Sequence, residues 1–387
     1  MTTKELDNKY VANTYARFPI CLTHGKGSLV YDEDGKEYID LGTGIAVNTF
    51  GYADDLWKDA VIEQLSSLQH ASNLYYTKPC ATLAQMLCER TGMKKVFFSN
   101  SGAEANECAI KVARKYGEIN KGAEYTTIIT LKDSFHGRTL TTLAATGQDV
   151  FHNDFLPLTA GFVHAIPNDI ESVKALVAEN KCCAIMFEVV QGEGGVRALD
   201  AEFLSALDEL AKKEDLLLVA DEVQCGNGRS GELYAYMNYG IVPDVVSTAK
   251  GLAGGLPLGA TLLSEKVENI LGAGMHGSTF GGNPVCAAAA INVFSRLDEE
   301  LLKSVKEKSA YIFNELNGAQ GVVSVSGLGL MIGIETTRPA GEIIEECREN
   351  GVLVIKAKNK IRLLPALNIE QALLEKAVKI IKEACAK

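Results

Sequence analysis

The sequence predicts an α/β protein with a large, doubly wound, mostly parallel sheet and a smaller α+β domain. Short apolar and β-branched runs alternate with helical patterns through the middle of the chain, and this alternation is typical of βαβ units. The chain has 387 residues, which is more than one average domain. Apolar residues make up 47% of it and charged residues 22%, a globular composition that favours a sizeable buried core.

The large domain is expected over residues 50–282. Its strands are short runs of apolar and β-branched residues, and its helices carry apolar residues three and four positions apart. In chain order we expect a strand over 96–99, a helix over 103–116, strands over 126–131 and 184–190, a helix over 201–213, and strands over 216–220, 245–248 and 259–263.

The pattern changes after Gly282, and residues 283–387 are expected to form the smaller domain. The N-terminal segment, 1–49, is expected to pack with it and to contain a hairpin that turns at Asp34-Gly35, because Asp-Gly is a strong hairpin signal. In chain order we expect helices over 284–297 and 299–316, strands over 322–325 and 330–335, a helix over 340–350, strands over 352–355 and 361–364, and a helix over 368–386.

Composition and charge exclude several classes of function. The chain has 38 Lys and Arg against 49 Asp and Glu and no Lys/Arg block, so we expect neither nucleic acid nor an anionic membrane as a partner. No apolar run reaches the roughly 18 residues of a membrane span, and the acidic start MTTKELDNKY is unlike a secretory signal. We therefore expect a cytoplasmic protein. Ten cysteines without a CxxC pair and six histidines without HExxH predict neither disulfides nor a metal site.

The stretch from Asn100 to Glu107 follows a predicted strand and opens a predicted helix. Ser101 and Glu104 form an S-x-x-E capping pattern, and Gly102 allows the backbone to approach a ligand closely. The free N–H groups at such a helix start, at the positive end of the helix dipole, form an anion site that most often binds phosphate. Taken alone, the motif favours an ordinary capped helix.

Two ionisable residues stand out because their surroundings are apolar. Asp221 follows the apolar run 216–220, and ligands of open α/β sheets bind beyond the carboxyl ends of the strands. A structural salt bridge or a helix N-cap is an equally favoured explanation of Asp221. Lys250 is the only charged residue in 245–264. Desolvation lowers the pKa of an amine and makes it nucleophilic, as covalent catalysis on a carbonyl group requires.

A phosphate cradle, a strand-end carboxylate and a solitary lysine together match the three attachment points of pyridoxal phosphate. Seven stretches then carry a wider resemblance, namely FFSNSGAEANECAIKVARKY, SFHGRT, QGEGGV, LLVADEVQCGNGRSG, DVVSTAKGLAGGLPLGA, HGSTFGGNP and IRLLPAL. On these motifs, over nearly its whole length, the chain resembles the class III (ornithine-type) aminotransferases, which are pyridoxal-phosphate enzymes of fold type I. Within that family it is most similar to the members that act on N-acetylornithine.

The resemblance implies the residues that hold the phosphate and the ring of the coenzyme. Ser101, Gly102 and Ala103 would bind the phosphate, the last two through backbone N–H groups. Phe135 of SFHGRT would stack on the pyridine ring, although core packing is the alternative for an aromatic residue there.

The resemblance also implies the catalytic pair, Lys250 and Asp221. Lys250 would bond covalently to the coenzyme and act as general base and acid. Asp221 would pair with the pyridine nitrogen, and Gln224 with the 3-hydroxyl group. Glu222 and Val223, between those two, are expected among the coenzyme-binding residues.

Two arginines and a glutamate are implied in substrate binding. Arg138 would bind a substrate carboxylate distal to the reacting amine, and Arg362 would bind the α-carboxylate of glutamate and 2-oxoglutarate. Glu193 would pair with Arg362 while an ω-amino substrate is bound. A surface ion pair is the alternative for each of them. Ser278 and Tyr15 would line the substrate site.

The activity implied is the transamination of N2-acetyl-L-ornithine with 2-oxoglutarate, which gives N-acetyl-L-glutamate 5-semialdehyde and L-glutamate in arginine biosynthesis. Gly44 would leave room for the N-acyl group. Thr279 would reach the phosphate from the neighbouring subunit, so a homodimer with shared active sites is expected. The alternatives are succinylornithine, ornithine or 4-aminobutyrate as the amino donor, and a pyridoxal-phosphate racemase or aminomutase on the same scaffold.

Overall fold

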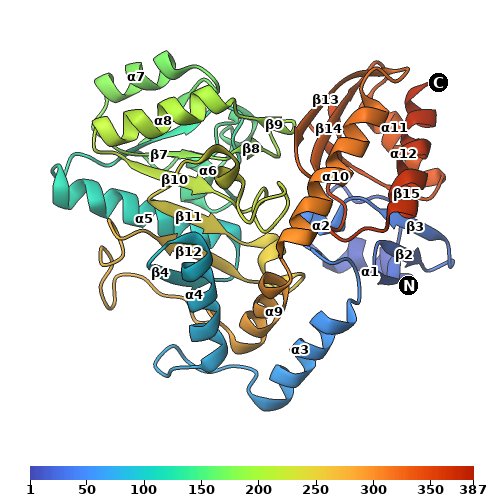
Figure 1. Cartoon of the computed structure of the whole chain (residues 1–387), viewed down its shortest axis with the longest axis horizontal. Helices are drawn as coiled ribbons and strands as arrows, with labels where there is room; N and C mark the ends of the chain where they lie inside the picture. The colour runs from blue at the N-terminus through green and yellow to red at the C-terminus, as the bar shows by residue number, and fades with distance from the viewer.

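The computed structural model describes all 387 residues and contains one seven-stranded sheet, two four-stranded sheets and a two-stranded ribbon (Figure 1). The large sheet has the order β4-β12-β11-β10-β7-β5-β6. Strand β12 is antiparallel to both of its neighbours and the other four pairs are parallel, which confirms the mostly parallel sheet. Its strands are β4 (Lys95–Ser99), β5 (Thr127–Leu131), β6 (Phe162–Ala165), β7 (Cys182–Phe187), β10 (Leu217–Asp221), β11 (Val245–Thr248) and β12 (Gly259–Leu263).

Helices cover both faces of this sheet. On β10, Leu217 and Val219 belong to an apolar cluster with α5 (Gly102–Asn120), whereas Leu218 and Ala220 belong to the cluster that includes α8 (Ala201–Lys213). Figure 1 shows α8 and α5 on opposite sides of β7 and β10, as in a doubly wound sheet. The other elements of this part are α3 (Asp55–Ser67), α4 (Lys78–Thr91), α6 (Leu140–Ala145), α7 (Ile170–Glu179), η1 (Asp149–Phe151), η2 (Ala235–Tyr239) and η3 (Lys250–Ala253).

The C-terminal part of the chain forms a second unit together with the N-terminal strands. Strand β3 (Glu37–Asp40) pairs in parallel with β15 (Val352–Leu353), and it forms the expected hairpin with β2 (Leu29–Asp32). The blue N-terminal strands accordingly lie beside the red C-terminal helices in Figure 1. The domain boundaries at 49/50 and 282/283 stay a prediction. The remaining elements are β1 (Leu22–Lys26), β13 (Val322–Leu328), β14 (Met331–Thr336), β16 (Ile355–Ala357), β17 (Lys360–Leu363), α9 (Pro284–Ser295), α10 (Glu299–Leu316), α11 (Ala340–Glu349) and α12 (Gln371–Cys385).

Two of the expected strands differ from the structure. The strand expected over 184–190 ends at Phe187, and the chain leaves the sheet at Glu188, whose carboxylate accepts a hydrogen bond from the Phe135 N–H at 2.9 Å. The chain then pairs again in the ribbon of β8 (Val190–Gln191) and β9 (Arg197–Ala198). The strand expected over 352–355 is divided between two sheets, because β15 pairs with β3 and β16 pairs with β17.

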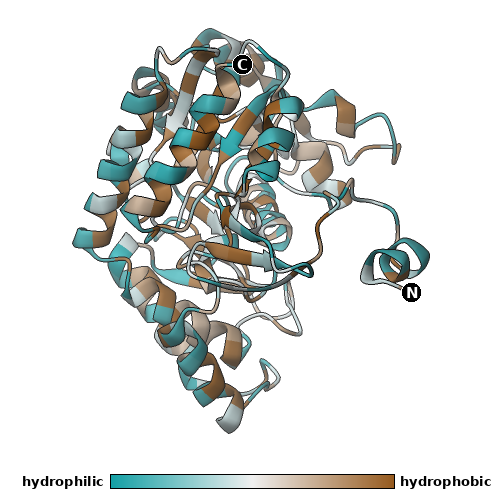
Figure 2. Ribbon diagram, turned by 90° about the vertical axis from the view of Figure 1, so that its right-hand side faces the viewer, coloured by the Kyte–Doolittle hydropathy of each residue, from teal (hydrophilic) through white to brown (hydrophobic).

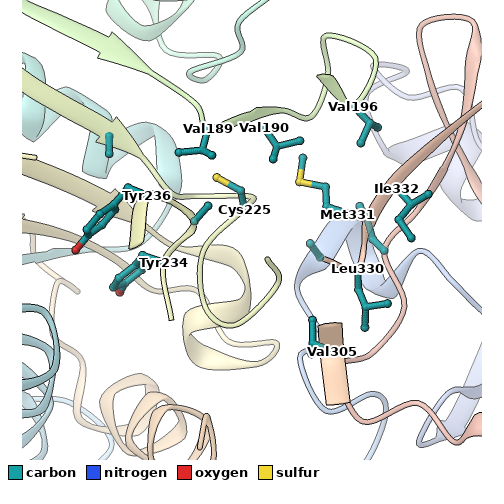
Figure 3. Close-up of a cluster of buried hydrophobic side chains, with 14 of the residues drawn as sticks. Val189, Val190, Val196, Cys225, Tyr234, Tyr236, Val305, Leu330, Met331 and Ile332 are labelled. Carbon is teal, nitrogen blue, oxygen red and sulfur yellow. The ribbon is translucent and has the colours of Figure 1, made fainter. Parts of the chain in front are cut away.

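The two units share one apolar core. Figure 3 shows this contact, in which Val190 and Val196 of the large unit lie next to Met331 and Ile332 of β14. In contrast to this core, helix α1 (Thr3–Tyr10) has no buried residue, and Figure 2 shows it apart from the rest of the chain. None of the helices has the length and apolar character needed to cross a membrane.

Candidate active site

The start of α5 presents two backbone N–H groups that have no partner in the chain. Ser101 is the N-cap, and its Oγ accepts a hydrogen bond from the Glu104 N–H at 3.2 Å. The Glu104 carboxylate in turn accepts from the N–H of Asn100 at 2.6 Å, one residue before the position that a capping box would use. Gly102 and Ala103 donate no hydrogen bond within the chain. Both N–H groups are therefore available to an anion at the positive end of the helix.

Two glycines allow neighbouring loops to pack against this helix start. A Cβ on Gly102 would lie 2.5 Å from Cγ1 of Val223, and a Cβ on Gly137 would lie 2.9 Å from the Cβ of Ala103. The loop after β10 and the loop that carries Phe135 thus both reach the free N–H groups. The sequence placed Gly102, Ala103 and Val223 in one site, and the structure brings them together.

Asp221, the last residue of β10, is buried and held by three donors. Its Oδ2 accepts hydrogen bonds from Asn106 Nδ2 and His136 Nδ1, both at 2.7 Å, and its Oδ1 accepts from the Val223 N–H at 3.0 Å. Asn106 also donates to the backbone carbonyl of His136 at 2.8 Å. No Lys or Arg pairs with Asp221, and its ion-pair contact within the chain is the one to His136.

A second carboxylate, Glu188, lies at the end of the neighbouring strand β7. It is buried, and burial followed by the charge of Asp221 raises its pKa well above the ordinary value. Its hydrogen bond with the Phe135 N–H fixes the backbone of the loop that carries the expected ring-stacking residue. The sequence did not identify Glu188, Asn106 or His136 as site residues. For Glu188 a signal existed, since it is a charged residue at the end of an apolar strand.

Lys250 begins η3 directly after β11, with a backbone φ of +46°. A left-handed φ is uncommon outside glycine and is often found at functional sites. The lysine is half-buried. Desolvation lowers the pKa of its amine and outweighs the charges of Glu193 and Asp221, which act to raise that pKa. No group of the chain forms a hydrogen bond or an ion pair with Nζ. The structure thus places an amine without a partner close enough to Glu193 and Asp221 for their charges to affect its pKa.

Arg362 on β17 is buried and forms an ion pair with Glu193. Arg362 Nη1 lies 2.6 Å from Glu193 Oε1, and Nη2 lies 3.3 Å from Oε2. Burial acts to raise the pKa of Glu193, but the charge and hydrogen bonds of Arg362 outweigh it and hold the pKa below its ordinary value. Gln224 Oε1 accepts from Arg362 Nη1 at 2.9 Å, so this side chain contacts the arginine in the structure. Both Glu193 and Arg362 lie close enough to Lys250 to affect its pKa.

Arg138 differs from Arg362 because it is exposed and forms no ion pair. Its guanidinium carbon lies 4.2 Å from the ring centroid of Phe151 and 5.5 Å from that of Phe135. The two phenylalanine rings pack edge to face at 5.9 Å. Phe151, which the sequence analysis missed, lies in η1 and orients Arg138 through a cation–π contact. The FHNDF stretch gives no signal that would have identified it.

Three of the expected site residues form no hydrogen bond with Lys250, Asp221 or Arg362. Ser278 Oγ accepts from Asn100 Nδ2 and from the Gly281 N–H, both at 3.0 Å, and so lies near the start of α5. Thr279 is exposed, and Tyr15 is 70% exposed on the N-terminal segment. Neither contacts the site of its own chain.

Glu222 was expected among the coenzyme-binding residues, but its side chain is engaged in the core. Its carboxylate accepts hydrogen bonds from the N–H groups of Ala235 and Tyr236, both at 2.9 Å, and from the Cys225 thiol at 3.4 Å. Burial raises the pKa of Glu222 to about 7. The side chain therefore joins the loop after β10 to η2 and is not free to contact a ligand.

The residues present fit pyridoxal phosphate. The free N–H groups of Gly102 and Ala103 suit a phosphate, and the amine of Lys250 has no partner, as expected of a group that forms a covalent bond to a ligand. Asp221 Oδ1, which accepts only from Val223 within the chain, can accept a further hydrogen bond from a ring N–H. Position 102 requires a glycine, because a Cβ there would clash with Val223 of the loop after β10.

Comparison with known proteins identifies the family. The family model described as Aminotransferase class-III matches residues 10–385. The chain is 50% identical to the acetylornithine aminotransferase of Haemophilus ducreyi, over 98% of this chain and 97% of that protein, and 42% identical to that of Methanocaldococcus jannaschii, over 98% and 96%.

Solved structures agree. The crystal structure of the ornithine aminotransferase from Toxoplasma gondii has a TM-score of 0.95 at 28% identity, covering 100% of this chain and 95% of the other. The N-acetylornithine aminotransferase from Stenotrophomonas maltophilia has a TM-score of 0.86 at 33% identity, covering 99% and 98%. The chain therefore belongs to the class III aminotransferases and is a pyridoxal-phosphate enzyme of fold type I.

Proposed function

We propose that the enzyme transfers the terminal amino group of N2-acetyl-L-ornithine to 2-oxoglutarate and releases N-acetyl-L-glutamate 5-semialdehyde and L-glutamate. With this donor the reaction is a step of arginine biosynthesis. The acetylornithine aminotransferases that match this chain, which are 41% to 50% identical to it over nearly its whole length, support this choice of substrate.

One observation carries the proposal, namely the different states of the two arginines. Arg362 is buried and neutralised by Glu193, whereas Arg138 is exposed and unpaired. A donor whose carboxylate is distant from its reacting amine can bind Arg138 while Arg362 stays paired. An acceptor such as 2-oxoglutarate also has a carboxylate next to the reacting carbon, and that carboxylate would replace Glu193 on Arg362. One pocket thereby serves two substrates with differently placed charges.

The residues of the site have distinct roles in this reaction. Pyridoxal phosphate, when bound, supplies an electron sink for the bond that breaks at the substrate carbon. Lys250 holds the coenzyme and moves the proton at that carbon, because its amine has a lowered pKa and no partner. Asp221, fixed by Asn106 and His136, keeps the ring nitrogen protonated. Gly102 and Ala103 bind the phosphate through their N–H groups.

Gly44 supports an N-acylated donor. Its φ is +65°, and an added Cβ would meet Val47 and Asn48 only at ordinary contact distances of 3.7 and 3.8 Å. The absence of a side chain at Gly44 leaves space that a bulkier residue would fill, and we infer from the family resemblance that this space accommodates the acyl group.

We further propose a homodimer in which Thr279 contributes to the partner's phosphate site. Thr279 is exposed and forms no hydrogen bond in its own chain, and its neighbour Phe280 is 59% exposed. Asn73 donates to the Ser278 carbonyl at 3.0 Å, and Tyr76 in the same segment is fully exposed. Exposed apolar surface of this kind marks protein interfaces. The cytoplasmic location expected from the sequence stays a prediction.

Product analysis tests the proposed reaction. The purified enzyme with pyridoxal phosphate is incubated with N-acetylornithine in the presence and absence of 2-oxoglutarate, and glutamate and semialdehyde are measured. We expect multiple turnovers only with 2-oxoglutarate. Turnover without it would indicate a racemase or an aminomutase instead. Competition between N-acetylornithine, succinylornithine, ornithine and 4-aminobutyrate then gives the donor preference, and a higher kcat/KM for any of the other three would contradict the proposal.

Subunit mixing tests the shared site. Lys250→Ala and Thr279→Ala subunits are mixed, exchanged and assayed at limiting pyridoxal phosphate. If Thr279 acts across the interface, one site of each mixed dimer has both residues intact, and activity rises above that of either variant alone. If Thr279 acts within its own chain, mixing restores nothing.

A further inference from the structure

The backbone directly after Arg362 is held by side chains from two distant parts of the chain. Thr43 Oγ1 donates a hydrogen bond to the carbonyl of Leu364 at 2.6 Å. Arg229 Nη1 donates to the carbonyl of Pro365 and, at 3.3 Å, to that of Leu330. Two consecutive carbonyls beyond the substrate arginine are therefore fixed by side chains that the reaction itself does not use.

Thr43 belongs to a strained turn. In α2 (Thr43–Ala46) every residue has a positive φ, from +47° at Thr43 to +66° at Ile45. The left-handed region is costly for residues other than glycine, and for a β-branched threonine it is exceptional. Strain of this kind persists where the surroundings fix it, and it is often found at functional sites.

Asp40 fixes this turn in place. The buried carboxylate accepts hydrogen bonds from the Gly42 N–H at 2.7 Å and the Thr43 N–H at 3.0 Å, and from the Tyr52 hydroxyl at 2.7 Å. Thr43 itself is 1% exposed, and Leu364 is the only acceptor of its hydroxyl. A threonine in this unfavourable conformation is explained by the hydrogen bond that it makes to the strand of Arg362.

The turn also touches the other end of the active site. Thr49, just after it, donates from Oγ1 to the carbonyl of Gly251 at 2.7 Å, and a Cβ on Gly251 would lie 3.3 Å from the carbonyl oxygen of Ala46. Gly251 is the residue after Lys250. Residues 43–49 therefore span from the segment of the expected coenzyme lysine to the segment of the substrate arginine.

Arg229 provides a second and independent connection. Its guanidinium is buried without a carboxylate partner, so only backbone carbonyls stabilise the charge. A buried cation in such surroundings is costly, and burial lowers its pKa to about 9. Arg229 lies in the loop that begins at Asp221 and includes Gln224, which itself contacts the Arg362 side chain. This loop thus contacts the guanidinium of Arg362 through Gln224 and the backbone three residues after Arg362 through Arg229.

We propose that Thr43 and Arg229 are positioning residues for Arg362, which fix the distance of its guanidinium from Lys250. This inference rests on the proposed role of Arg362 in binding the carboxylate next to the reacting carbon. Its consequence is asymmetric, because N-acetylornithine leaves Arg362 paired with Glu193. Loosening the strand therefore impairs the half-reaction with 2-oxoglutarate and leaves the half-reaction with N-acetylornithine unchanged.

The test uses the loaded enzyme and substitutions that remove one hydroxyl. Thr43→Val removes the bond to Leu364 with little change in shape, and Thr43→Ser keeps the hydroxyl. Thr261→Val is the matched control, since Thr261 is buried and donates to the Ala105 carbonyl at 2.8 Å, on the far strand β12. Stopped-flow absorbance measures each half-reaction separately. Calorimetry measures the Kd of glutarate, a diacid that cannot react.

For Thr43→Val we expect roughly tenfold weaker glutarate binding and a roughly tenfold slower half-reaction with 2-oxoglutarate, the order of loss that small misplacements cause. Thr43→Ser should remain close to wild type, and Thr261→Val should lower thermal stability without this asymmetry. Arg229→Lys is a second variant, expected to act in the same direction because a lysine cannot bridge both carbonyls in the same way.

The outcomes separate the two proposals. Arg362→Lys serves as the reference for the role of Arg362 itself. If Arg362→Lys weakens 2-oxoglutarate but Thr43→Val and Arg229→Lys slow both half-reactions equally or neither, the positioning inference is wrong. If Arg362→Lys leaves glutarate binding and the 2-oxoglutarate half-reaction unchanged, the proposed role of Arg362 fails instead.

Discussion

Glu193→Gln isolates the ion pair on which the proposed alternation of substrates depends. The substitution keeps the shape and one acceptor oxygen but removes the charge that lies 2.6 Å from Arg362 Nη1. Two unit charges about 4 Å apart interact by about 4 kcal/mol at an effective dielectric constant of about 20. The Glu193 side chain is 28% exposed and the neutral amide still bonds the guanidinium, so we expect a net loss of about 2 kcal/mol in the free energy of unfolding.

The same substitution changes the competition between substrates. In the wild type the carboxylate of 2-oxoglutarate must displace Glu193 from Arg362, and in Glu193→Gln it displaces a neutral group. A saving of about 1.4 kcal/mol corresponds to roughly tenfold tighter binding of 2-oxoglutarate. The substitution does not strengthen the binding of N-acetylornithine, because the carboxylate of this donor is now attracted to Arg362 instead of Arg138. We therefore expect the ratio of kcat/KM for N-acetylornithine to that for 2-oxoglutarate to fall by at least roughly tenfold.

Half-reaction kinetics and thermal unfolding measure these two effects separately. The control is Glu346→Gln on helix α11. It removes a carboxylate that lies 3.2 Å from Nη1 of Arg338, and this ion pair lies outside the site. This control should lower stability and leave the substrate ratio unchanged. Equal changes in both half-reactions of Glu193→Gln, or a change in the substrate ratio with the control, would refute the reasoning.

Three further predictions concern the lysine, the single tryptophan and pH. Lys250→Ala should abolish transamination and the visible band of bound coenzyme, measured by absorbance, yet keep the melting temperature of the coenzyme-free protein, since the lost amine has no partner. Trp57 Nε1 donates a hydrogen bond to the Ala253 carbonyl at 2.9 Å, and Ala253 lies in the turn that Lys250 begins. Binding of pyridoxal phosphate should therefore quench the tryptophan fluorescence of the wild type. Trp57→Phe should show no such signal. Because the folded-state pKa of Glu193 is lowered, its ion pair stabilises the protein above about pH 4.3, the unfolded value. That contribution is lost as the pH falls through the folded pKa, so the stability difference between wild type and Glu193→Gln, measured by denaturant unfolding, should shrink on acidification.

Much of the fold could be predicted because its signals are local. Strands β11 and β12 and helices α8 and α10 begin and end where their apolar patterns begin and end. The strand expected up to Val190 failed at Glu188, since its apolar pattern continues beyond the point at which the carboxylate turns toward Phe135. An apolar run shows that a segment is buried, and it does not show which sheet or loop buries it.

The site was predictable where one residue contrasts with its neighbours. Lys250 in an apolar segment and Asp221 after an apolar strand were identified in this way. Asn106, His136 and Thr43 were missed because their roles arise from contacts between distant segments. Thr43, for example, bonds a carbonyl 321 positions away. Glu222 shows the converse, because it adjoins Asp221 in the sequence but its side chain points toward η2.

The two buried carboxylates near Lys250 divide their tasks according to their surroundings. Asp221 accepts hydrogen bonds from Asn106, His136 and the Val223 N–H. Glu188 accepts one from the Phe135 N–H, and burial followed by the charge of Asp221 raises its pKa well above the ordinary value. Enzymes set two carboxyl groups to different roles through surroundings that differ in this way. We therefore assign Asp221, at the end of strand β10, to the proposed ring nitrogen, and Glu188 to the loop that carries Phe135.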